Sequence, residues 1–196
     1  MIKITFMGAG STVFLRNVLG DCIYTDALKG MEIALYDIDG QRLEQSAAIL
    51  EAINKGNGCP ASIRSYLAQR TAEALSGADF VINAIQVGGY DPCTITDFEI
   101  PKKYGLRQTI GDTLGIGGIM RALRTIPVLE DFARDMEAVC PNAWFLNYTN
   151  PMSMLTGYML RYTGVKTLGL CHSVQTCSKT LMDAIGMSDR LEGRRS

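Results

Sequence analysis

The chain has 196 residues, with 19 Lys and Arg against 20 Asp and Glu, and 47% of its residues are hydrophobic. This length indicates one domain or slightly more, enough to bury a core without disulfides or metals. The near-neutral charge argues against nucleic acid or an anionic membrane surface as a partner. No apolar run approaches the roughly 18 residues of a membrane helix, and no signal-peptide pattern opens the chain. The 6 cysteines are irregularly spaced, so we expect a reduced, cytoplasmic protein.

Strands and helices are predicted to alternate in the first half of the chain. Strands are expected over 2–7, 31–36, 63–67 and 80–85, separated by helices over 13–24, 41–55 and 71–75. Residues 88–92 break this pattern and open a long loop region, in which 104–118 is glycine-rich and poorly periodic.

The second half continues the alternation. Helices are expected over 120–139, 152–162 and 174–185, and strands over 144–146 and 165–170. Pro127 is expected at a kink or in a first helical turn. The whole order predicts an α/β fold with a Rossmann-like, doubly wound and mostly parallel sheet.

A glycine turn and an acidic residue lie where a dinucleotide site would need them. Gly8-x-Gly10 stands between the first strand and the first helix, and Asp37 ends the second strand. The glycines allow a tight turn and close approach of a pyrophosphate to the helix N-terminus, and the carboxylate can accept hydrogen bonds from ribose hydroxyls. The third glycine of the usual fingerprint is absent, because Val13 stands there. The alternative is a pair of turn glycines and a surface aspartate.

The predicted carboxyl edge of the sheet gathers further polar residues. It is expected to bring together Gly8, Asp37, Gln86, Asn150 and Cys171, as a cofactor-and-substrate crevice requires. Asn150 precedes Pro151, and capping of the next helix would be a sufficient structural explanation for it.

Cys171 stands beside His172, the only histidine of the chain. A thiolate is a soft metal ligand and an imidazole can do proton chemistry, whereas adjacent residues leaving a strand point to opposite sides. One would then bind metal and the other move a proton; the alternative is a buried thiol beside a half-exposed imidazole. Arg121 and Arg124, three residues apart on one helix face, are either a solvated surface pair or substrate contacts.

Motifs over nearly the whole chain resemble glycoside hydrolase family 4, and within it the α-galactosidases of the melibiase type. The matching stretches are 4–12 (ITFMGAGST), 34–39 (ALYDID), 88–94 (GGYDPCT), 117–127 (GGIMRALRTIP), 146–152 (LNYTNPM) and 169–175 (GLCHSVQ). Such enzymes are NAD-dependent exceptions to glycosidase chemistry with two carboxylates.

The resemblance implies an unusual reaction. NAD⁺ would take a hydride from C3 of the sugar, and a divalent metal, usually manganese, would polarise the resulting ketone. The C2 proton would then be removed, the glycosidic oxygen eliminated, water added and the hydride returned. No net oxidation would occur, because bound NAD would be recycled in each turnover.

The resemblance also implies roles for individual residues. Cys171 matches the metal-binding cysteine, His172 the proton donor to the leaving group, and Asn150 a substrate-binding asparagine. The matched cofactor positions are Gly8, Gly10, Ser11, Asp37 and Asp39. The resemblance also favours an unphosphorylated α-galactoside as substrate, because this chain has Cys-His-Ser where the phospho-glycosidases of the resembled family have Cys-Asp.

Length separates the chain from the resembled family, whose members run to about twice this size, as expected for a dinucleotide domain followed by a substrate domain. We expect residues 1–196 to be the NAD-binding Rossmann-like domain, without the C-terminal substrate and metal domain. The second metal ligand and the base that removes the C2 proton have no counterpart here. We therefore expect no glycosidase turnover from this chain alone, and self-association through apolar surface that a missing domain leaves uncovered.

Two other functions remain open from the residues. The first is an NAD-dependent 2-hydroxyacid dehydrogenase of the lactate and malate type, which shares the fold and could use His172 with Arg121 and Arg124. It would accumulate NADH, whereas the glycosidase would release free sugar without net NADH. The second is a non-enzymatic nucleotide-binding regulatory module, in which replacing Cys171 would change neither activity nor metal affinity.

Overall fold

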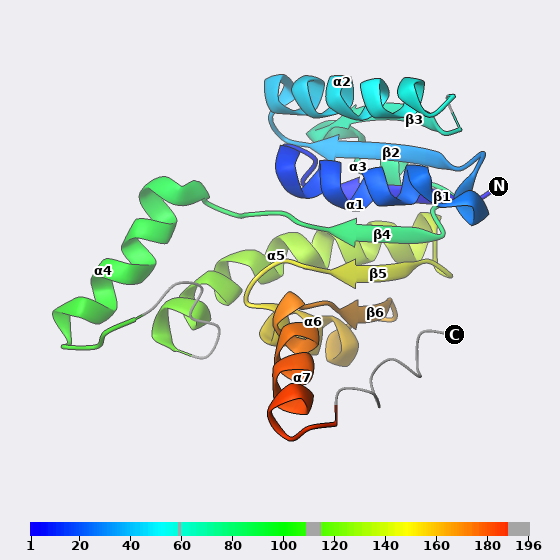
Figure 1. The fold of residues 1–196 in the computed structure, drawn as a ribbon. Coiled ribbons are helices and arrows are strands. Elements are labelled where there is room, and N and C mark those ends of the chain that lie inside the picture. Colours follow the sequence, from blue (N-terminus) through cyan, green and yellow to red (C-terminus); the bar gives the residue numbers. More distant parts are fainter. Residues whose placement is uncertain (59, 109–114, 188–196) are drawn as a thin grey trace.

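The structure is a computed structural model, and it describes residues 1–58, 60–108 and 115–187. Six parallel strands form one sheet in the order β3-β2-β1-β4-β5-β6 (Figure 1). The strands are β1 (Lys3–Met7), β2 (Glu32–Asp37), β3 (Ser62–Leu67), β4 (Phe80–Asn83), β5 (Trp144–Asn147) and β6 (Lys166–Gly169). This order confirms the predicted Rossmann-like fold, because two βαβ halves diverge from the adjacent strands β1 and β4.

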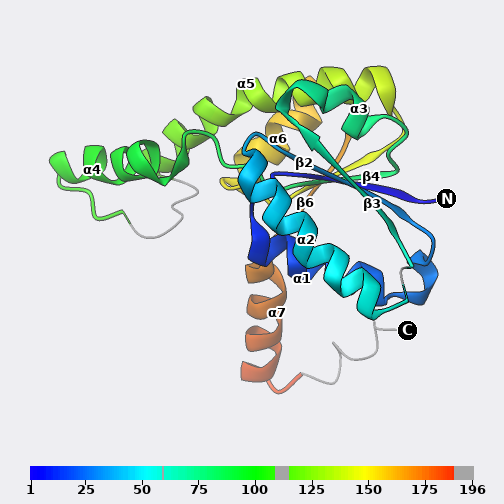
Figure 2. The same ribbon diagram turned by 90° about the horizontal axis from the view of Figure 1, so that it is seen from above.

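Helices cover both faces of the sheet (Figure 2). The helices of the described residues are α1 (Thr12–Tyr24), α2 (Gly40–Gly56), α3 (Thr71–Leu75), α4 (Ile95–Lys103), α5 (Ile116–Val139), α6 (Met152–Tyr162) and α7 (His172–Ala184), of which α4 and α7 do not pack on the sheet. Short irregular helical turns join them at η1 (Asp26–Leu28), η2 (Ala68–Arg70) and η3 (Gly89–Thr94). Helices α1 and α2 pack on one face, and α3, α5 and α6 pack on the other.

Two apolar clusters hold these layers together. Successive side chains of a strand point to opposite faces, so Ile4 and Phe6 of β1 face α1 and α2, while Met7 faces α3 and α5. Both faces of β1 and β2 are buried, which explains their nearly continuous apolar sequence. The carboxyl ends of the strands are thereby held in a fixed frame.

The region predicted as a loop after residue 88 contains helix α4, so that expectation was wrong. The helix was missed because Gly88, Gly89 and Pro92, which precede it, usually mark turns, and because Pro101 lies inside it. Buried contacts of α4 with α5 override this weak local preference. Residues 109–114 of the same region lie outside the described residues.

Helix α5 begins four residues before the predicted start and continues through Pro127, so a first-turn position for this proline was wrong. Proline removes one hydrogen bond, to the carbonyl of the residue four positions earlier, which here is Leu123. Both residues are exposed, so water can satisfy that carbonyl. The long helix therefore tolerates the proline.

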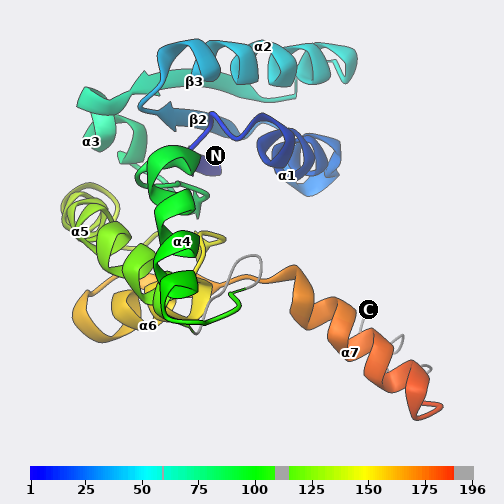
Figure 3. The same ribbon diagram turned by 90° about the vertical axis from the view of Figure 1, so that its left-hand side faces the viewer.

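Helix α7 points away from the sheet, and most of its described side chains are exposed (Figure 3). Leu181 and Ile185 on or beside it are more than half exposed, and Leu168 of the edge strand β6 is also exposed. Apolar side chains are thus exposed at this end of the sheet. No helix in the described ranges is long and apolar enough to cross a membrane.

The packing of α5 on the sheet can be tested with one substitution at two positions. Leu129 is fully buried, whereas Leu123 on the same helix is 65% exposed. We expect Leu129→Ala to lower the free energy of unfolding by about 2–5 kcal/mol and Leu123→Ala by no more than about 0.5 kcal/mol. Denaturant unfolding followed by circular dichroism measures both changes, and equal losses would contradict this packing.

Candidate functional site

One row of backbone hydrogen bonds brings the strand exits together. In four pairs of neighbouring strands, the backbone amide of the residue just after one strand donates to a backbone carbonyl at the end of the other strand, at 2.9 Å. The four bonds run from Gly8 to Tyr36, from Ala84 to Met7, from Tyr148 to Asn83 and from Leu170 to Asn147. The exits of β2, β1, β4, β5 and β6 therefore lie side by side. The structure thus gathers the segments that carry Asp37, Gly8, Gln86, Asn150 and Cys171 at one edge, as predicted.

Gly8 forms the tight turn after β1. Its φ is +89°, in the region that favours glycine, and a Cβ there would lie 2.7 Å from the carbonyl oxygen of Ala84. The turn is therefore pressed directly against the chain leaving β4. Only glycine fits both the backbone conformation and the space.

Asp37 holds the second half of the same turn. One carboxylate oxygen accepts a hydrogen bond from the amide of Gly10 at 2.5 Å, and the other accepts from the amide of Asp39 at 2.9 Å. A Cβ on Gly10 would lie 2.9 Å from the first oxygen. The carboxylate at the end of β2 thus fixes the glycine turn. Its predicted contact with a ribose stays a prediction.

Ser11 and Asp39 occupy the N-cap positions of α1 and α2. The Ser11 side chain does not cap α1, so it does not occupy the amides at the start of that helix. The Asp39 carboxylate accepts from the amide of Arg42 at 3.1 Å, which gives it a structural role in starting α2. Its predicted cofactor contact stays a prediction.

A buried polar network missed by the sequence analysis ties β4 to β5. The Asn83 amide nitrogen donates to the Asn147 side-chain oxygen at 2.9 Å and to the Thr149 hydroxyl at 3.1 Å. That hydroxyl lies 3.1 Å from the Ile85 carbonyl, to which it donates. All three side chains are buried. An asparagine at the end of each of two neighbouring strands was the available sequence signal.

Asn150 is exposed beside this network and precedes Pro151 through a cis peptide bond. Pro151, not Asn150, occupies the N-cap position of α6, so the capping explanation for Asn150 was wrong. The ring of Tyr148 packs edge-on against Phe14 of α1 with 4.8 Å between centroids. This contact places the 147–151 segment next to the helix that follows the glycine turn.

Cys171 occupies the N-cap position of α7, and its side chain is exposed. The alternative interpretation of Cys171 as a buried thiol is therefore wrong. His172 is the first residue of α7, which starts two residues earlier than predicted; its side chain lies outside the described part of the structure. Among the described residues, no three His, Cys, Asp or Glu side chains gather as a metal site would require.

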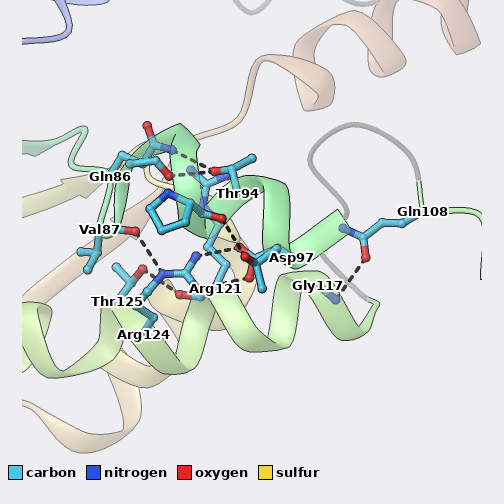
Figure 4. Close-up of polar contacts among 12 residues, drawn as sticks. Gln86, Val87, Thr94, Asp97, Gln108, Gly117, Arg121, Arg124 and Thr125 are labelled. Atoms are coloured by element: carbon cyan, nitrogen blue, oxygen red, sulfur yellow. Dashed lines mark hydrogen bonds and ion pairs between the residues drawn. The ribbon is translucent and has the colours of Figure 1, made fainter. Parts of the chain in front are cut away.

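Arg124 is not part of a solvated surface pair, which corrects that alternative. Its two terminal nitrogens bind both carboxylate oxygens of the buried Asp97 at 3.2 and 2.6 Å, and its Nε donates to the Val87 carbonyl at 3.1 Å (Figure 4). The hydrogen bond with Asp97 raises the pKa of Arg124. Burial lowers the pKa of the neighbouring Arg121, although Asp97 opposes that shift.

A parallel sheet of this order, with a glycine turn after β1 and an acid at the end of β2, defines the Rossmann-like class, whose members bind dinucleotides at this edge. Residues 3–187 match the model of the family 4 glycosyl hydrolases, and the chain belongs to this family.

Three known proteins illustrate the relationship. An α-galactosidase of Bacillus subtilis is 63% identical over 195 residues, which are 99% of this chain and 45% of that enzyme. A 6-phospho-α-glucosidase from gut microorganisms, solved in complex with NAD and Mn²⁺, has a TM-score of 0.81 at 21% identity, over 95% of this chain and 42% of its own. The lactate dehydrogenase of Cryptosporidium parvum, solved with lactic acid and nicotinamide adenine dinucleotide, has a TM-score of 0.58 at 17% identity, over 84% and 42%.

The last two comparisons show a shared fold alone. The chain spans less than half the length of each of these three proteins.

The buried network can be tested at Thr149. Thr149→Val keeps the shape but removes the hydroxyl that serves Asn83 and Ile85, so we expect a loss of about 1–3 kcal/mol in the free energy of unfolding. Thr149→Ser keeps the hydroxyl and should lose only about 1 kcal/mol for its missing methyl group. Thermal and denaturant unfolding compare the two variants, and a valine variant as stable as the serine variant would contradict the network's role.

Proposed function

We propose that this chain is the NAD-binding part of a metal-dependent glycosidase that cleaves unphosphorylated α-galactosides. One observation supports the assignment of NAD binding: the Gly8–Gly10 turn packs closely against Ala84 and is held by a hydrogen bond to Asp37. The substrate class is supported by the 63% identity to an α-galactosidase. The proposal includes homo-oligomerisation and a cytoplasmic location, which stay predictions.

The residues at the strand exits fit a dinucleotide. The missing side chain of Gly10 lets the Asp37 carboxylate reach its amide, and the start of α1 favours the negative charge of a pyrophosphate. Asp37 retains lone pairs beyond its two backbone hydrogen bonds, and these can accept from ribose hydroxyls. Its charge would repel the 2′-phosphate of NADP, so NAD is the preferred form.

The order of the exits supports the assignment of the remaining residues. Along the edge, Asp37 comes first, then the Gly8 turn, the segment after β4, Asn150 and finally Cys171. Neighbouring strands lie about 4.8 Å apart, so the exits of β1 and β6 are separated by roughly 14 Å. That distance leaves room for a nicotinamide and one sugar ring between the turn and the cysteine.

Within this arrangement the chain's residues would bind and orient the sugar. Bound NAD⁺ and a divalent metal would supply reversible hydride transfer and Lewis acidity, so that elimination and addition of water replace direct displacement. Asn150 would hold a sugar hydroxyl with its amide, and His172 would protonate the departing glycosidic oxygen.

The Cys171 thiol is the residue through which this chain would hold the metal. A thiolate is a strong ligand, but one ligand does not make a site, and the described residues gather no cluster of three. We expect the other ligands to come from the substrate and from residues outside this chain.

The nucleotide assignment is tested by calorimetric titration of the purified chain. We expect NAD⁺ to bind and NADP⁺ to bind more weakly because of Asp37. Gly8→Ala should weaken NAD⁺ binding by about tenfold or more, because its methyl group meets Ala84 and its φ is strained.

Gly20→Ala is the matched control for this substitution. Gly20 lies inside α1, where a Cβ would meet only Ile53 at 4.0 Å. This variant should keep NAD⁺ binding and gain up to about 1 kcal/mol of stability from helix propensity. Equal NAD⁺ affinity of the two variants, or NADP⁺ binding as tight as NAD⁺ binding, would exclude the proposed site.

The need for further residues is tested by activity. We expect no hydrolysis of an aryl α-galactoside by the 196-residue chain in the presence of NAD⁺ and Mn²⁺. A sustained rate, retained after repurification, would show that these residues suffice. Release of galactose without NADH accumulation by a longer form would separate the glycosidase from a hydroxyacid dehydrogenase, which has only the shared fold in its favour.

A further inference from the structure

The segment that leaves β4 is held at both ends and, between them, by the Thr149 hydroxyl, which donates to the Ile85 carbonyl. At its start, the backbone of Ala84 lies under the Gly8 turn, where a glycine Cβ would come within 2.7 Å. At its far end, Val87 and Asp97 are both held by Arg124 of α5. The chain between these points has a defined path along the carboxyl edge.

Arg124 is the link between that path and the rigid body of the protein. It makes three hydrogen bonds, to the Val87 carbonyl and to both oxygens of the Asp97 carboxylate (Figure 4). Asp97 is 4% exposed, so its charge depends on this partner. The Arg124 side chain is 25% exposed and lies at the surface of the site rather than in the core.

Gly88 allows this side chain to approach. Its φ is +88°, and a Cβ there would lie 2.4 Å from the sulfur of Cys93 and 3.0 Å from Nε of Arg124. The glycine brings the backbone close enough for Val87 to accept its hydrogen bond. The side chains of Gln86 and Thr94 close the same turn with a 3.1 Å hydrogen bond.

Helix α5, to which Arg124 belongs, is fixed on the sheet by its buried apolar side chains. One to three turns further along α5, Leu129, Phe132 and Met136 pack into the core against the sheet. Because α5 is fixed on the sheet, Arg124 holds the segment after β4 at a fixed place relative to the sheet. Ala84 and Ile85, at the start of the segment, pack against the apolar clusters. Val87, Gly88 and Asp97 belong to neither cluster, so Arg124 holds the far end of the segment.

The fold indicates which half of a dinucleotide this segment would face. The adenosine half would lie over β2, where Asp37 stands, and the pyrophosphate would cross at β1. The nicotinamide half would then lie over β4 and β5. The chain from Ala84 to Val87 is the exit of β4 and so would form its wall.

We propose that Arg124 is a positioning residue that, through Val87 and Asp97, holds the β4 exit in place against the nicotinamide half of NAD. This inference rests on the proposed function, because it requires the chain to bind NAD. The planar fork of arginine is needed, since a lysine cannot bind both carboxylate oxygens and the Val87 carbonyl in one fixed geometry.

The test compares two ligands, NAD⁺ and ADP-ribose, which lacks the nicotinamide. Calorimetry measures their affinities for the wild-type chain, Arg124→Met and Arg124→Lys. Arg134→Met is the matched control, because Arg134 lies on the same helix and, among the described residues, forms ion pairs with Glu130 and Asp131 of its own helix. Thermal unfolding of each variant shows that it folds.

We expect Arg124→Met to weaken NAD⁺ binding by about tenfold or more, which is the effect typical of losing a hydrogen bond to a charged group. ADP-ribose affinity should stay within about twofold, because the adenosine side is a separate site. Arg124→Lys should show the same difference with a smaller loss of NAD⁺ affinity, and Arg134→Met should show none. The fluorescence of bound NADH, which reports the nicotinamide environment, should change in Arg124→Met and not in Arg134→Met.

Equal losses for both ligands in Arg124→Met, or no loss for either, would overturn the positioning role while leaving NAD binding intact. A wild-type chain that binds neither ligand would overturn the proposed function and this inference with it. If Arg124→Met does not fold, Arg124→Lys decides, and equal weakening of both ligands in that variant overturns the proposal.

Discussion

The close contact between the Gly8 turn and the Ala84 carbonyl is the constraint on which the rest of the site depends. It leaves no room for a side chain, so the exits of β1 and β4 lie against each other at the point where the two halves of the sheet diverge. Asp37 fixes this turn from the β2 side, and the network of Asn83, Asn147 and Thr149 extends the arrangement to β5. Each neighbouring exit is thereby positioned by hydrogen bonds rather than by loose loop contacts.

Much of the fold could be predicted from the sequence, because it follows from hydrophobic periodicity and from the glycine and proline residues that end helices and strands. The apolar strand before Gly8, the acid after β2 and the alternation of elements indicated the fold, and motifs spread along the chain indicated the family. Helix α4 could not be predicted, because its sequence is interrupted by glycine and proline and its stability comes from contact with α5. Tertiary burial, not local preference, decides such a segment.

The sequence predicted which strand-exit residues lie at one edge of the sheet, but not the hydrogen bonds that connect them. Asp37 was expected as a ribose acceptor, and only the structure shows that it also holds Gly10. Arg124 looked like a surface residue because its partner Asp97 lies 27 positions away, beyond any helical spacing. Long-range polar pairs leave no periodic trace in a sequence, which is why the buried network and this ion pair were both missed.

The central claim, that the strand exits hold NAD with a defined direction, is tested most directly by a crystal structure of the chain with NAD⁺. We predict the adenosine ribose at Asp37, the pyrophosphate at the start of α1, and the nicotinamide against Ala84–Val87. A nucleotide bound in the reverse direction, or at any other surface of the molecule, would contradict it.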